Sequence, residues 1–109
     1  MSNYSRGRDL EYAVKHKLED LGYKCIRTAG SHSPLDVLAA RKGERLGIQA
    51  KLGGSISSKE WNELWEWCDA YEFQPLIVER DRGLKFHLVT GRKLERGKYP
   101  WTLWEPQET

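Results

Sequence analysis

The sequence predicts an α/β domain in which a mixed β-sheet is flanked by helices. Helical and strand-like patterns follow one another in the order α-β-β-β-α-β-β, and such an alternation is typical of helices packed on a sheet. The chain has 109 residues, of which 39% are hydrophobic, as expected for one globular domain. We therefore predict a single domain over residues 1–109, with its core in residues 6–90 and a tail at 99–109.

The first predicted elements are a helix and a strand. In residues 6–21 three leucines and a valine recur at intervals of three and four residues, which predicts an amphipathic helix, and Gly22 is suited to end it. Residues 23–28 contain Tyr, Cys and Ile in an alternating pattern, which predicts a strand. The composition of residues 29–34 is that of a loop.

A β-hairpin is predicted next. The apolar runs 35–40 and 46–51 are separated by residues 41–45, which are polar and centred on a glycine. Residues 53–55 then break the chain before a second helix. Ser57 and Glu60 have the spacing of a capping box, in which each side chain accepts a hydrogen bond from a backbone N–H at the helix start.

The second helix is followed by two further strands. Its expected apolar stripe consists of Trp61, Leu64, Trp65, Cys68 and Tyr71. Trp67 lies off this stripe and is the best candidate in the helix for a dimer contact. Residues 75–79 and 85–90 predict strands, joined by a turn at 81–83. No secondary structure is predicted for the tail, which contains Trp101 and Trp104.

The charge of the chain is nearly balanced but unevenly distributed. There are 18 basic and 16 acidic residues, so the net charge of +2 excludes no class of partner. Basic side chains are concentrated in the first and last quarters, where they could attract nucleic acid by counterion release, or else form an ordinary solvated surface. They are Arg6, Arg8, Lys15, Lys17, Lys24, Arg27, Arg80, Arg82, Lys85, Arg92, Lys93, Arg96 and Lys98.

The cysteines and the chain start indicate the compartment. Cys25 and Cys68 lie in apolar segments without metal-like spacing, as small core residues of a reducing environment do. The first residues lack the apolar stretch of a signal peptide, and no run is long enough to cross a membrane. We expect a cytoplasmic protein.

The most informative placement is Asp36 on one strand of the predicted hairpin and Gln49-Ala50-Lys51 on the other. Adjacent antiparallel strands would bring a carboxylate, an amide and an ammonium group together. Mg²⁺ prefers oxygen ligands, so Asp36, the Gln49 amide and the Ala50 carbonyl could hold one ion. Lys51 lies two residues after Gln49, hence on the same face, where it could stabilise charge on a phosphate or orient the attacking water. The ordinary alternative is that Asp36 is a polar residue at the start of one strand and Lys51 a polar residue at the end of the other, without a functional role.

Glu11 and His32 are further candidates, each with an ordinary alternative. Glu11 neighbours the apolar stripe of the first helix, from which its carboxylate could reach the metal; it could equally be a solvated charge or pair with Lys15, four residues on. His32, in the loop before Asp36, could contact a phosphate or transfer a proton, or could have no functional role.

These motifs resemble the PD-(D/E)XK nuclease superfamily, and most closely the archaeal-type Holliday junction resolvases. The likeness covers residues 6–90 and implies a restriction endonuclease-like fold. The matching pieces are Arg6-Gly7-Arg8 with Glu11, Gly22-Tyr23, Arg27-Thr28-Ala29-Gly30-Ser31, Pro34-Leu35-Asp36-Val37-Leu38-Ala39 and Ile48-Gln49-Ala50-Lys51.

The resemblance implies that Glu11, Asp36 and Lys51 are catalytic, and that Ser31, or else Ser33, acts near the scissile phosphate. It also implies a homodimer that places two metal sites on opposing strands of a four-way DNA junction and leaves 5′-phosphate and 3′-hydroxyl ends. We expect Mg²⁺ as cofactor, with Mn²⁺ as its substitute. The expected DNA contacts are Arg6, Arg8, Arg27, Ser31, His32 and Ser33.

Two departures from the resolvase pattern keep other functions open. Leu35 separates Pro34 from Asp36, and Gln49 stands where resolvases have a glutamate. Removing a negative charge about 2 Å from a divalent ion could weaken its binding by several kcal/mol. Mrr-type restriction endonucleases are similar in having a Gln-x-Lys motif, so the alternatives are a nuclease of duplex DNA and an inactive pseudonuclease that binds nucleic acid or protein.

Overall fold

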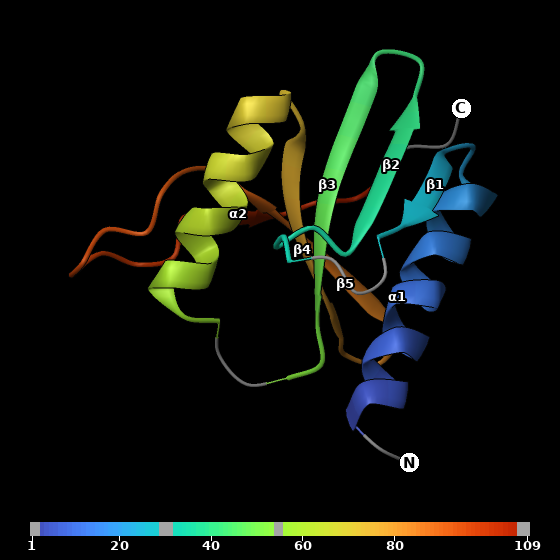
Figure 1. Cartoon of the computed structure of the whole chain (residues 1–109), viewed down its shortest axis with the longest axis horizontal. Helices are drawn as coiled ribbons and strands as arrows, with labels where there is room; N and C mark the ends of the chain where they lie inside the picture. Colours follow the sequence, from blue (N-terminus) through green and yellow to red (C-terminus); the bar gives the residue numbers. More distant parts are fainter. Residues whose placement is uncertain (1–2, 29–31, 54–55, 107–109) are drawn as a thin grey trace.

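The computed structural model describes residues 3–28, 32–53 and 56–106 (Figure 1). The predicted order of elements is confirmed, and one short strand is added at the end of the chain. The elements are α1 (Asn3–Asp20), β1 (Lys24–Arg27), β2 (Val37–Arg41), β3 (Glu44–Lys51), α2 (Ser58–Tyr71), β4 (Gln74–Arg80), β5 (Leu84–Val89) and β6 (Trp101–Leu103).

The strands form one mixed sheet whose spatial order, β1-β2-β3-β4-β5-β6, follows the chain. All neighbouring pairs are antiparallel except β3 and β4, which are parallel and are connected through α2. Side chains from α1 pack on one face of the sheet and those from α2 on the other, because neighbouring β4 residues such as Leu76 and Ile77 belong to the two different hydrophobic clusters. The predicted mixed sheet flanked by helices is confirmed.

Helix α1 packs through the predicted periodic residues. Leu10, Val14 and Leu18 are fully buried against the sheet. The helix ends where Gly22 adopts a positive φ of 96°, a conformation that glycine enters without steric cost. Glu11 follows Leu10 directly and therefore lies at the margin of the buried stripe, as the sequence predicts.

The β2–β3 hairpin is tighter than expected. Its turn is limited to Lys42 and Gly43, because Arg41 and Glu44 are already paired strand residues. Gly43 has a φ of 78°, as two-residue hairpin turns require. The resulting register places Asp36, which directly precedes β2, beside Gln49 near the end of β3.

Helix α2 begins at the predicted capping box and lies unusually close to β3. The Ser57 hydroxyl accepts the backbone N–H of Glu60, and the Glu60 carboxylate accepts the backbone N–H of Ser57. Gly47 permits the close approach, since a Cβ there would lie 2.7 Å from the Cys68 sulfur. The expected apolar stripe is only partly buried, because Tyr71 at its end is exposed.

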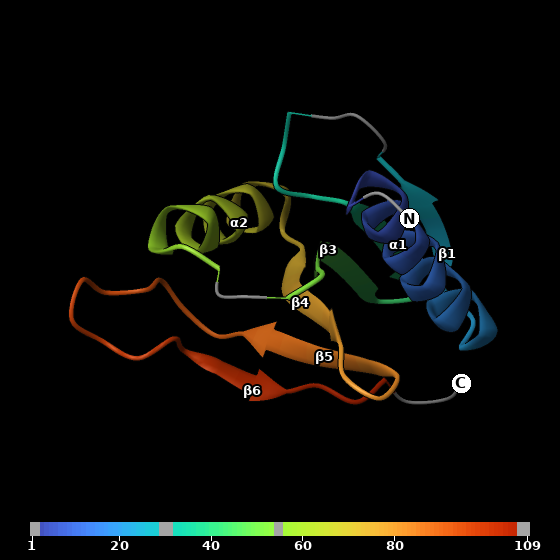
Figure 2. The same ribbon diagram turned by 90° about the horizontal axis from the view of Figure 1, so that it is seen from below.

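The tail that the sequence left unassigned completes the sheet. Figure 2 shows β6 beside β5, with which it pairs through Val89 and Trp101. The Trp101 ring stacks on His87 with ring centroids 4.0 Å apart, and His87 is buried with Glu79 as its hydrogen-bond partner. These contacts give His87 a structural role in the sheet. The hydroxyl of Tyr99 donates to the carbonyl of Ile56, which joins the tail to the start of α2.

No helix in residues 3–28, 32–53 and 56–106 is both long and apolar enough to cross a membrane. Cys25 and Cys68 are free thiols. Burial raises the pKa of Cys25 to about 11 and that of Cys68 to about 12, so both are poor nucleophiles, as small packing residues usually are.

Candidate active site

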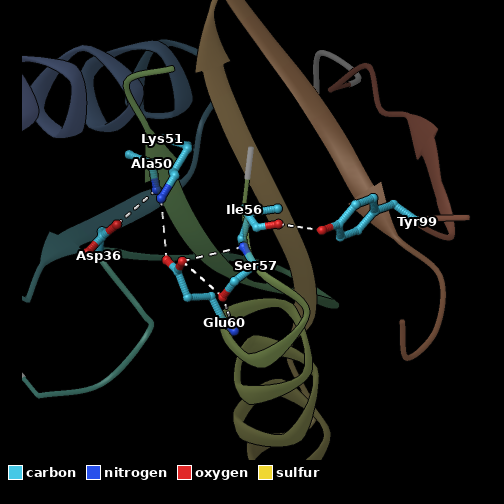
Figure 3. A network of polar contacts seen from close by, with 7 residues as sticks. All are labelled: Asp36, Ala50, Lys51, Ile56, Ser57, Glu60 and Tyr99. Carbon is cyan, nitrogen blue, oxygen red and sulfur yellow. Dashed lines mark hydrogen bonds and ion pairs between the residues drawn. The ribbon is translucent and has the colours of Figure 1, made fainter. Parts of the chain in front are cut away.

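The centre of the candidate site is Asp36, held where β2 begins. Its backbone N–H donates to the carbonyl of Ile48, and its carboxylate Oδ2 accepts the backbone N–H of Ala50 at 2.9 Å (Figure 3). Both bonds reach β3, so the register of the hairpin determines where the carboxylate lies. Thr28, directly after β1, donates its backbone N–H to the Asp36 carbonyl. This bond joins the two ends of the loop that precedes β2.

The Asp36 carboxyl is held in an environment that resists ionisation. Withdrawal from water raises its pKa to about 6, and the negative charge of Glu11 acts in the same direction. The Ala50 N–H and the positive charges of Lys51 and Arg27 oppose the shift without cancelling it. A carboxyl group with a perturbed pKa among other charged groups is a common feature of catalytic sites.

Gln49 contributes a buried oxygen without a partner. Its side-chain Oε1 is inaccessible to water and accepts no hydrogen bond within the described part of the chain. A buried polar atom of this kind costs folding free energy, so it requires a structural or functional reason. Ligation of a cation is one such reason, because an amide oxygen is a suitable ligand for Mg²⁺.

The donor set suits a lightly coordinated Mg²⁺. Residues 3–28, 32–53 and 56–106 contain no group of three or more His, Cys, Asp and Glu side chains able to hold a metal. At this end of the hairpin the Asp36 carboxylate and the Gln49 amide oxygen are candidate ligands. Mg²⁺ usually keeps several waters and takes one or two carboxylates from the protein, so the residues present fit it.

Lys51 lies on the same strand as Gln49 and has an acidic partner that sequence reasoning missed. Its Nζ is 3.4 Å from Oε2 of Glu60, the third helical residue of α2. Burial by itself would raise the pKa of Glu60, but the Ser57 N–H and the Lys51 charge outweigh burial and hold that pKa below its usual value. The capping-box pattern locates Glu60 in the helix, yet nothing in the local sequence indicates its contact with β3.

Glu11 pairs with a different residue from the one that the sequence suggests. Its Oε1 accepts a hydrogen bond from Nη1 of Arg27 at 2.9 Å, and both side chains are largely buried. Lys15, the expected alternative partner, instead pairs with Glu19, so that reading of Glu11 is wrong. Arg27, predicted to contact DNA, also lies over the ring of Tyr12. Glu11 is near enough to Asp36 to raise its pKa.

The remaining predicted site residues lie in the loop before β2 and in α1. Ser31 lies outside the described residues. Ser33 accepts the backbone N–H of Leu35, and His32 is exposed. Arg6 and Arg8 are exposed in the first half of α1. A surface hollow of about 390 Å³ is lined by Arg6, Asp9, Leu52 and Arg80. Because Leu52 follows Lys51 in the sequence, the hollow lies next to the end of β3.

Comparison with known proteins identifies the family. The model of the archaeal Holliday junction resolvase family (Hjc) matches residues 2–103. The crossover junction endodeoxyribonuclease Hjc of Methanocaldococcus jannaschii is 29% identical over 84 residues, which are 73% of this chain and 62% of that protein. The chain thus spans 62% of the length of this curated relative.

A solved structure has the same fold. The structure of Archaeoglobus fulgidus Hjc, a Holliday junction resolvase from an archaeal hyperthermophile, superposes with a TM-score of 0.65. The sequences are 22% identical, and the match covers 74% of this chain and 70% of the other. The resemblance inferred from the sequence motifs is confirmed by the family match: the chain belongs to the archaeal Holliday junction resolvase (Hjc) family.

Proposed function

We propose that this chain is a metal-dependent endodeoxyribonuclease that hydrolyses phosphodiester bonds in branched DNA, with the four-way junction as its substrate. The observation that carries the proposal is the Asp36 carboxylate, fixed by the Ala50 N–H beside Gln49 and Lys51. Membership of the resolvase family supports both the reaction and the substrate. We further propose Mg²⁺ as the cofactor, with Mn²⁺ able to replace it, and an intracellular place of action on DNA.

In the proposed reaction each residue has a defined task. Asp36 and Gln49, aided by the Ala50 carbonyl and the charge of Glu11, would hold the ion. When bound, the ion supplies an acidified water and polarises the phosphate. The Lys51 ammonium group neutralises charge that develops on the phosphoryl oxygens and orients the attacking water. Ser31 or Ser33 would contact the phosphate next to the cut.

Arg6 and Arg8 are proposed to bind the DNA backbone. Both lie in α1, and Arg6 lines the hollow that Leu52 and Arg80 also line, next to the end of β3. Contacts to phosphates orient a protein on DNA without reading the sequence, which suits an enzyme that selects its substrate by shape. The guanidinium group of Arg27, another predicted contact, is paired with Glu11.

A homodimer is part of the proposal, because a four-way junction is resolved by two cuts on opposing strands. Trp67 is exposed and stacks on Tyr71. Together with Glu66 and Ala70 these residues line a surface hollow of about 340 Å³ on α2. An exposed aromatic pair of this kind suits a subunit contact, since aromatic residues are enriched in interfaces.

The decisive experiment is cleavage of a labelled synthetic four-way junction with and without Mg²⁺, beside a linear duplex of the same sequence. We expect paired, Mg²⁺-dependent nicks on opposing strands of the junction and an intact duplex. Equal cleavage of both substrates would support a duplex nuclease instead, the alternative that the Gln-x-Lys motif leaves open. Binding without nicks in Mg²⁺ and in Mn²⁺ would contradict the enzymatic proposal and identify a pseudonuclease.

Replacing Gln49 by Glu is expected to retain or raise activity. A carboxylate in place of the buried amide adds a negative ligand, so half-maximal cleavage should require about tenfold less Mg²⁺, equivalent to about 1.4 kcal/mol. The measurement is a Mg²⁺ titration of the junction-cleavage rate. Gln74→Glu, the same change at the exposed start of β4, is the matched control and should leave the titration unchanged. A large loss of activity in Gln49→Glu would show that Gln49 is not near the metal.

A further inference from the structure

Glu60 is a carboxylate at the candidate site in addition to Asp36 and Glu11, and it comes from α2. Asp36, Gln49 and Lys51 all lie on or next to the β2–β3 hairpin, whereas Glu60 lies in the first turn of α2. Its Oε2 is 3.4 Å from Nζ of Lys51 (Figure 3). No other ion pair of Lys51 occurs within the described ranges of the chain.

The two carboxylate oxygens of Glu60 contact different residues. Its Oε1 accepts the Ser57 backbone N–H at 3.4 Å and the Ser57 hydroxyl at 3.2 Å, so this oxygen completes the capping box. Its Oε2 is directed to Lys51 instead. An ordinary capping residue needs only the first oxygen, so the second contact is not explained by the requirements of the helix.

The position of Glu60 is reinforced from the tail of the chain. Tyr99 donates to the carbonyl of Ile56, immediately before the capping serine. Trp61, immediately after Glu60, is fully buried and donates from its ring to the carbonyl of Gly91 at 2.9 Å. The first turn of α2 is thus held on both sides of Glu60, which limits the positions that its carboxylate can reach.

We propose that Glu60 is a positioning residue of the nuclease site: from α2, it holds the Lys51 ammonium group toward the reaction centre. The inference rests on the proposed function. Free of this contact, a lysine side chain samples many rotamers, and ordering it in advance reduces the cost of placing its charge at the phosphate.

The test compares Glu60→Gln with Glu63→Gln, the same change at an exposed position of the same helix. Glu60→Gln preserves the size of the side chain and an oxygen for the cap but removes the charge that holds Lys51. We expect the single-turnover cleavage rate at saturating Mg²⁺ to fall about tenfold or more in Glu60→Gln. The junction Kd in Ca²⁺ and the Mg²⁺ concentration for half-maximal rate should stay unchanged, and Glu63→Gln should match the wild type.

A second variant separates positioning from helix capping. Ser57→Ala removes the N-cap hydroxyl but keeps the Glu60 carboxylate, so it should lower Tm while the cleavage rate stays within about twofold, since a lost cap typically affects stability alone. A wild-type rate in Glu60→Gln would overturn the proposal. A raised Mg²⁺ requirement with an unchanged maximal rate would also overturn it, because Glu60 would then act on the metal and not through Lys51.

A structural readout keeps the proposal testable even if the protein cuts no DNA. Lysines dimethylated with ¹³C retain their charge and give separate NMR signals, and the Lys51 signal is identified by its loss in Lys51→Arg. We expect the Lys51 signal to shift and narrow in Glu60→Gln but not in Glu63→Gln. An unchanged Lys51 signal would overturn the positioning role, whereas a shifted signal in a protein without cleavage would contradict only the proposed function.

Discussion

Asp36→Asn is expected to abolish junction cleavage and, in the same protein, to raise the stability of the metal-free fold. The Asp36 carboxylate accepts the Ala50 N–H at the centre of the candidate site, so its loss should reduce the cleavage rate by at least about 1,000-fold, as expected for a principal metal ligand. Junction binding without metal should be retained, because Asn has nearly the same shape and its amide oxygen can still accept the Ala50 N–H.

The gain in stability follows from the raised pKa. The ordinary pKa of this carboxyl is 3.8 and its pKa in the folded protein is about 6, so ionisation disfavours the folded state. At about 1.36 kcal/mol per pKa unit, ionising Asp36 in the folded protein costs about 3 kcal/mol at most. Because the side chain is partly exposed to solvent, the expected gain in stability is about 1–3 kcal/mol. A neutral Asn does not pay this penalty.

The sign of the pH dependence makes this prediction specific. Between pH 4 and pH 6 the folded wild type binds more protons at Asp36 than the unfolded chain does, so its free energy of unfolding falls as the pH rises through this window. The advantage of Asn should therefore be complete above pH 6 and absent below pH 4.

Thermal unfolding of both proteins without metal, at pH 4 and pH 8, measures this difference. Asp69→Asn, at an exposed position of α2, is the matched control and should show no pH-dependent gain. An Asp36→Asn protein that is less stable than the wild type at pH 8 would show that Asp36 is not held in a desolvating site.

Trp61→Ala should cause the largest loss of stability among the substitutions considered, about 4 kcal/mol. The side chain is fully buried and packs against Tyr99 and Trp101, with ring centroids 4.8 Å and 5.6 Å away. Large-to-small changes of buried aromatic residues cost about 3–5 kcal/mol. The change also leaves the Gly91 carbonyl without its donor. Since domains are typically stable by only about 5–15 kcal/mol, the variant should be marginally folded.

Urea unfolding of the wild type, Trp61→Ala and Trp61→Phe tests this prediction. Phe retains much of the packing but not the hydrogen bond to Gly91, so Trp61→Phe should lie between the other two. A loss below about 1 kcal/mol for Trp61→Ala would mean that the tail and α2 are not packed together through this residue.

The parts of the fold that sequence reasoning predicted are those governed by local pattern. The burial of Leu10, Val14 and Leu18 follows from helical periodicity, and the capping box at Ser57 follows from a spacing of three residues. Strand β6 was missed for a physical reason. It has three residues, all exposed, and its side-chain contacts come from distant positions, such as the stacking of Trp101 on His87.

The candidate site divides in the same way. Asp36, Gln49 and Lys51 could be brought together by reasoning because a hairpin relates its two strands by simple counting. The partner of Glu11 could not be predicted in this way. A spacing of four residues favoured Lys15, whereas the observed partner is Arg27 on β1. The Lys51–Glu60 contact depends on how α2 packs on the sheet, which a local pattern does not encode.

The two-residue turn at Lys42 and Gly43 has a consequence for engineering this protein. Surface loops normally tolerate inserted tags or fluorophores, but here an insertion is restrained, because β3 is also paired with β4 and cannot slide. β2 is held in the same way by β1, so an extra residue would strain the pairing of β2 with β3. A shift of that pairing would carry Asp36 away from the Ala50 N–H at the opposite end of the hairpin. A label in the Lys42–Gly43 turn would therefore disturb the candidate site although the turn lies at the far end of the hairpin from it.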